Sequence, residues 1–95
     1  MKHETRLSLN ARRMTTRELA HAHLKEHLRL PEWYGNNLDA LHDCLGDFGE
    51  PTRIILRFAP ELERSLGAYG TKLIRVLQQA VEENPNLRLI LRTWI

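Results

Sequence analysis

The chain has 95 residues, of which 42% are hydrophobic and 27% charged, which is the size and balance of one globular domain with a single core. No apolar run approaches the roughly 18 residues of a membrane span, and the N-terminus lacks the apolar stretch of a secretory signal. A lone cysteine excludes an internal disulfide, and the net charge is only +2. We therefore expect one cytoplasmic domain over residues 1–95, in a reducing compartment.

The first part of the chain predicts a strand followed by a helix. Apolar and polar residues alternate over 4–9, the pattern of a strand with one buried face. Thr15 and Glu18 have the spacing of a helix capping box, and Met14 and Leu19 occupy the positions of a hydrophobic staple. The helix is expected to stop before Pro31. Its expected buried stripe is Leu19, Leu24 and Leu28.

A loop over 31–37 leads to a second helix, expected over 38–46. Asn36 or Asn37 can cap its start, and Gly46 can end it.

The second half of the chain predicts two more strands around two more helices. The strands are expected over 53–58 and 87–94, because both runs are rich in Ile and Leu. A short helix is expected over 60–66, with a proline at its start. Thr71 is expected to cap a longer helix, which an Asn-Pro pair stops after Glu83.

Strands that alternate with helices indicate an α/β fold with a parallel sheet. In each strand the apolar residues point one way and the arginines the other, whereas strands covered on both faces read as continuous apolar runs. Four helices on one face, joined by right-handed crossovers, then give a two-layer, three-stranded sheet in the order 1-2-3. The open face is expected to carry Arg6, Arg53, Arg57, Arg88 and Arg92.

The charge is strongly segregated along the chain. Residues 30–52 contain five acidic and no basic residues, whereas the rest contains 14 basic and seven acidic residues, a net charge of +7. Asp39, Asp43 and Asp47 are four apart, so they share one helix face at a spacing of about 6 Å. The helix dipole favours Asp39 but disfavours the other two, which lie near its negative end.

Four aromatic groups accompany this acidic face: Trp33, Tyr34, His42 and Phe48. One interpretation is a solvated acidic face with its aromatic residues in the core. The other is an anionic surface with aromatic contacts that enters a cationic cleft, since binding hot spots favour such groups. A nuclease active site is a cleft of this kind, because it holds phosphates, and carboxylates at phosphate spacing would imitate its substrate.

The run LPEWYGNNLDALHDCLGDF over 30–48 resembles the barstar family of intracellular inhibitors of barnase-type ribonucleases. The flanking segments match as well, so the similarity covers nearly the whole chain. The resemblance implies a two-layer α/β fold with a three-stranded parallel sheet in the order 1-2-3, in which the second helix and the loop before it block the nuclease active site.

The resemblance also implies roles for individual residues. Asp43 corresponds to the carboxylate that fills the substrate phosphate site, and Asp39 to a second acidic contact on the same face. Trp33 replaces a tyrosine that packs on the catalytic histidine. Gly35 and Asn37 match the contact loop and the helix start.

Other contact positions depart from the family pattern. His42 and Phe48 stand where the family has tryptophans, and Gly46 replaces a threonine. A glutamate that pairs with a nuclease arginine is Gln79 here, although Glu83 lies one turn further on. These departures predict a cognate nuclease other than barnase. The full set of expected partner contacts is Trp33, Tyr34, Gly35, Asn37, Asp39, His42, Asp43, Gly46, Phe48, Gln79 and Glu83.

No pattern in the sequence indicates catalysis. His23 and His27 share a helix face and could ligate zinc, but with no third ligand evident we expect solvent-exposed histidines. Cys44 is expected in the core. A glycine-rich phosphate loop and a nucleophile–base motif are both missing. We expect a protein that is not an enzyme, with no cofactor and no metal, that binds a basic nuclease one to one and binds neither membranes nor nucleic acid.

Two alternatives remain open. The arginines of the sheet face could bind nucleic acid, although isoleucines rather than aromatic residues stand between them. The chain could also have kept the barstar-like fold while binding a partner that is not a nuclease.

Overall fold

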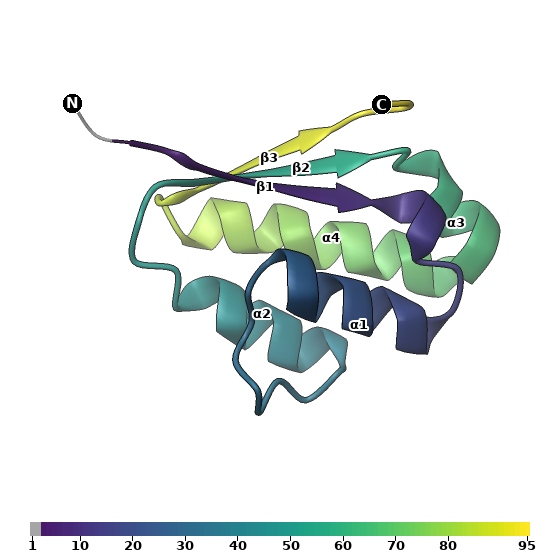
Figure 1. Cartoon of the computed structure of the whole chain (residues 1–95), viewed down its shortest axis with the longest axis horizontal. Helices are drawn as coiled ribbons and strands as arrows, with labels where there is room; N and C mark the ends of the chain where they lie inside the picture. Colours follow the sequence, from purple (N-terminus) through teal and green to yellow (C-terminus); the bar gives the residue numbers. More distant parts are fainter. Residues whose placement is uncertain (1–2) are drawn as a thin grey trace.

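The structure, a computed structural model, describes residues 3–95 (Figure 1). Its strands form one parallel sheet in the order β1-β2-β3, and all four helices lie on the same side of that sheet (Figure 1). The predicted fold class is therefore confirmed. In chain order the elements are β1 (Thr5–Asn10), a 3-10 turn η1 (Ala11–Arg13), α1 (Arg17–His27), α2 (Leu38–Gly46), β2 (Thr52–Arg57), α3 (Pro60–Leu66), α4 (Ala68–Glu83) and β3 (Leu87–Leu91).

The core lies between the sheet and the helices. Inward-facing residues of the strands, such as Leu9 and Leu56, are completely buried there. On the other face Arg6, Arg53 and Arg88 stand in register across the three strands. The alternation of apolar and charged residues along each strand thus follows from covering only one face. No helix among residues 3–95 is both long and apolar enough to span a membrane.

Helix α1 begins one residue later than predicted. Its N-cap is Thr16, not Thr15, because the Thr16 Oγ1 accepts a hydrogen bond from the Leu19 N–H at 3.1 Å. Leu19 lies off the buried stripe, because five positions separate it from Leu24, and it is 50% exposed. The predicted staple with Met14 is therefore wrong. The residues that α1 buries are Ala20, His21 and Leu24.

Helix α4 begins three residues before the predicted cap, Thr71. Gly67, with a φ of 59°, separates α3 from α4, and Gly70 lies within α4. A Cβ at Gly70 would collide with the backbone carbonyl of Leu62, so this glycine lets α3 and α4 approach closely. The expected cap residue is therefore an exposed residue of the first turn.

Strand β3 ends at Leu91, earlier than the predicted residue 94. Its partner β2 ends at Arg57, because Phe58 has a φ of 57° and leaves the strand. The chain after β3 then follows the start of α3, where the Ala59 N–H donates to the Arg92 carbonyl.

Candidate functional site

The loop before α2 is closed by the side chain of Asn37. Its Oδ1 accepts a hydrogen bond from the Ala40 N–H at 2.7 Å, and its amide donates to the Gly35 carbonyl at 3.2 Å. Asn37 is thus the N-cap of α2, and Asn36 instead takes a φ of 55° in the turn before it. Because one side chain holds both the loop and the helix start, the two move as a unit.

The three aspartates of α2 are all exposed, but they differ in their surroundings. Asp39 borders a cleft that also contains Arg17 and Lys72, and Asp47 borders a groove that contains Arg29. The Asp43 side chain is 83% exposed, and no lysine or arginine in residues 3–95 lies within ion-pair distance of it. Asp43 is therefore a strongly exposed carboxylate whose one neighbour within ion-pair distance, among the described residues, is His42.

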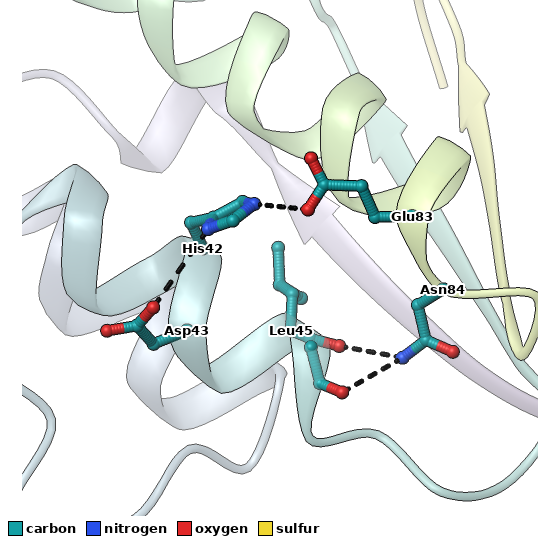
Figure 2. A network of polar contacts seen from close by, with 6 residues as sticks. His42, Asp43, Leu45, Glu83 and Asn84 are labelled. Carbon is teal, nitrogen blue, oxygen red and sulfur yellow. Dashed lines mark hydrogen bonds and ion pairs between the residues drawn. The ribbon is translucent and has the colours of Figure 1, made fainter.

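Glu83 of α4 is brought to the same face by His42. The His42 Nε2 lies 2.8 Å from the Glu83 Oε1, and its Nδ1 lies 4.0 Å from the Asp43 Oδ1 (Figure 2). Gln79 is exposed one turn earlier on α4. The histidine thus links two helices and sits between two carboxylates.

The end of α2 has no basic residue to stabilise its carbonyls, and the buried side chain of Asn84 takes that role. Its amide donates to the Leu45 carbonyl at 3.0 Å (Figure 2). The same amide donates to the Phe48 carbonyl at 3.0 Å and lies 3.5 Å from the Gly46 carbonyl. The Asn86 amide also donates to the Phe48 carbonyl. A neutral donor satisfies these carbonyls without neutralising the aspartates beside them. Sequence reasoning identified Asn84 only as a helix stop.

The predicted aromatic contacts separate into exposed and buried residues. Trp33 is 74% exposed, whereas Tyr34 is only 4% exposed and belongs to the core, so the expected surface position of Tyr34 is wrong. Phe48 is half-buried and packs against the core. Trp33 and Phe48 line a groove of about 240 Å³ with Cys44 at its base. Gly35 and Gly46 are exposed beside these residues.

The family model named Barstar (barnase inhibitor) matches residues 5–92. The chain belongs to the barstar family. Among its relatives is a protein of Bacillus subtilis (strain 168) named "Putative ribonuclease inhibitor YrdF", which is 39% identical over 67 residues. That match covers 70% of this chain and 74% of the relative. The family match includes every predicted contact residue, since all of them lie between positions 33 and 83.

In this barstar-family chain a buried histidine holds the contact loop against two helices. His21 Nδ1 lies 2.6 Å from the Tyr34 hydroxyl, and Nε2 lies 2.6 Å from the Tyr69 hydroxyl. Burial lowers the pKa of His21 and raises that of Tyr34. A neutral imidazole has one donor and one acceptor, so one hydroxyl donates to it and the other accepts from it. No sequence pattern pointed to Tyr69.

Of the other two histidines of α1, His27 is exposed as predicted, whereas His23 is partly buried. The His23 Nε2 accepts a hydrogen bond from the Asn10 N–H at 3.0 Å, and its ring stacks on that of His27 at 4.0 Å. Within residues 3–95 no three His, Cys, Asp or Glu side chains are grouped as metal ligands. Cys44 is buried as expected, and burial, with Asp47 and Asp43 nearby, raises the pKa of its thiol.

The arginines of the open sheet face are partly paired within the fold. Glu4 contacts Arg53 at 3.0 Å and Arg88 at 3.9 Å, and the Arg57 Nε donates to the Ser8 hydroxyl at 2.9 Å. Glu4 thus reduces the positive potential at Arg53 and Arg88, which the rival nucleic-acid role would use, whereas the neutral Ser8 hydroxyl leaves the charge of Arg57 in place.

Proposed function

We propose that this protein inhibits a barnase-type ribonuclease, or a related nuclease toxin, by covering its active site with α2 and the loop before it. The observation that carries the proposal is the exposed Asp43, which lies between Asp39 and Asp47 on α2 and has no lysine or arginine of residues 3–95 within ion-pair distance; His42 links it to Glu83. Membership of the barstar family supports the same role. A nuclease active site must be cationic to hold phosphates, so it complements such a surface.

In this proposal Asp43 occupies the position of a substrate phosphate among the basic groups of the nuclease. Trp33, exposed at the edge of the same surface, packs against the nuclease as an aromatic contact. Glu83 supplies the charge that Gln79 lacks, because His42 holds it beside α2. The caps at the two ends of α2 fix this surface before binding, which lowers the entropy cost of association.

Steady-state RNA cleavage at several inhibitor concentrations tests the proposal. The nuclease should be a basic ribonuclease, and inhibition should be competitive with RNA at one inhibitor per nuclease. Association should also slow as salt is added, because complementary charges steer the encounter. Tight binding that leaves RNA cleavage unchanged would contradict a blocked active site.

The departures from the family pattern lead us to propose that barnase is a poor target and that the protein gives immunity to a different nuclease in the cytoplasm. His42, Gly46 and Gln79 replace contact residues of the family, so the rim of the surface fits a different partner. Co-expression with nucleases encoded beside this gene provides the test. We expect survival only with the inhibitor present, and equal protection against barnase would contradict this part.

A further inference from the structure

A second charged feature lies where β1 and β2 end, and it shares no residue with the predicted nuclease contact. It is a cleft of about 610 Å³ between these strand ends and α1. Its lining includes the guanidinium groups of Arg12, Arg13 and Arg57 and the hydroxyl of Thr15, with Glu26 as its single carboxylate. The cleft is therefore basic, in contrast to the acidic face formed by α2.

The positive charges of this cleft are not neutralised within the fold. Among residues 3–95 no carboxylate lies within 4.0 Å of Arg12, Arg13 or Arg57. Two of the guanidinium groups are nevertheless held in place. Arg57 donates to the Ser8 hydroxyl at 2.9 Å, and Arg12 lies 4.7 Å above the Phe58 ring. Their donors are thus positioned without an internal anion.

His23 lines the same cleft and accepts a hydrogen bond there. The His23 Nε2 accepts from the Asn10 N–H, so neutral His23 carries its proton on Nδ1. Burial, and then His27, Arg57 and Arg13, lower the pKa of His23 to about 4, while Glu26 opposes them. Burial is the largest of these causes, so His23 is neutral near pH 7 and adds no charge of its own to the cleft.

We propose that this cleft binds a phosphate group, presented by a free phosphorylated small molecule or by an RNA backbone. The paired N–H groups of a guanidinium match the spacing of two phosphate oxygens. A phosphate also has more acceptor oxygens than a carboxylate, so it can accept hydrogen bonds from several arginines at once. The carboxyl ends of parallel strands, where Asn10 and Arg57 lie, are also the edge at which open α/β sheets bind ligands. The inference does not depend on the proposed nuclease contact.

Titration of the isotope-labelled full chain by NMR tests this proposal, with inorganic pyrophosphate in one arm and a short single-stranded oligoribonucleotide in the other. Arg13→Gln removes one exposed cleft cation, and Arg75→Gln removes an exposed cation of α4 as the matched control. We expect Arg13→Gln to weaken binding about tenfold or more, because a charged hydrogen bond is lost, and Arg75→Gln to leave it unchanged. Bound pyrophosphate should also raise the pH at which His23 titrates.

Binding of pyrophosphate supports a free phosphorylated ligand, and binding of the oligonucleotide alone supports an RNA backbone. Arg13→Gln should still inhibit the nuclease like the wild type, which separates this site from the proposed function. Binding of neither probe would overturn the proposal. Equal binding by Arg13→Gln and the wild type, or equally tight binding of a polyglutamate peptide, would overturn it as well.

Discussion

Replacing Asn84 with alanine should destabilise the fold and loosen the end of α2. The substitution removes three hydrogen bonds of 3.0 Å, two from the Asn84 amide to the Leu45 and Phe48 carbonyls and one from the Asn86 N–H to the Asn84 Oδ1. Each buried bond contributes about 1 kcal/mol net, and a carbonyl left without any donor costs more. Here each carbonyl keeps a second donor, the Phe48 N–H for Leu45 and the Asn86 amide for Phe48. We therefore expect a loss of about 3 kcal/mol.

Urea unfolding and thermal melting measure this effect, and for a domain of this size the melting temperature should fall by roughly 12–24 °C. The control is Gln78→Ala, which truncates an exposed amide of α4. Asn84→Asp keeps the acceptor for the Asn86 N–H but loses the donor and adds a charge near the negative end of α2. It should destabilise at least as much. A free energy of unfolding within about 0.5 kcal/mol of the wild type for Asn84→Ala would refute this account.

Three further predictions concern pH, packing and recognition. Because the pKa of His23 is lowered in the folded protein, the unfolded chain binds more protons between about pH 6.5 and about pH 4. The free energy of unfolding should therefore decrease as the pH is lowered through this range. Urea unfolding should show a smaller decrease for His23→Gln. Gly70→Ala should lower the free energy of unfolding by about 1–3 kcal/mol, because the added methyl group collides with the Leu62 backbone. The control Gly49→Ala adds a methyl group in open space and should leave stability unchanged. Equal melting temperatures of the two variants would refute this prediction. Trp33→Ala should weaken nuclease binding by about 2 kcal/mol without changing stability, as calorimetry can check.

Most of the fold could be predicted from the alternation of apolar and charged residues in the strands and from the capping residues in the loops. The alternation of arginines with Ile and Leu predicted that one face of the sheet is covered, and the Asn36-Asn37 pair predicted where α2 starts, although only the structure identifies Asn37 as the cap. Errors arose where tertiary packing outweighs local signals. Thr15 and Thr16 are both able to cap a helix, and only packing decides between them. Glycine often marks the end of a helix, but Gly70 lies inside α4, because a side chain at this position would collide with the backbone of α3.

The candidate site was predictable only in part for a related reason. The spacing of the aspartates specifies their shared face on α2, since helical geometry alone determines it. The burial of Tyr34 and the bond of Asn84 to the end of α2 depend on contacts across 13 and 39 positions, which local sequence does not encode. The pairing of His42 with Glu83 is likewise a contact between helices.

Affinity for the nuclease after removal of single carboxylates tests the central claim most directly. Asp43→Ala and Glu82→Ala each remove one exposed negative charge, the first from α2 and the second from α4. Asp43→Ala should weaken binding by about 2–5 kcal/mol, or about 30-fold to 5,000-fold, a range set by the complex of barnase with barstar, the family's own reference pair. Glu82→Ala should change the dissociation constant less than about threefold, as expected for a charge outside the contact. Equal effects of the two substitutions, measured by surface plasmon resonance, would contradict a contact centred on α2.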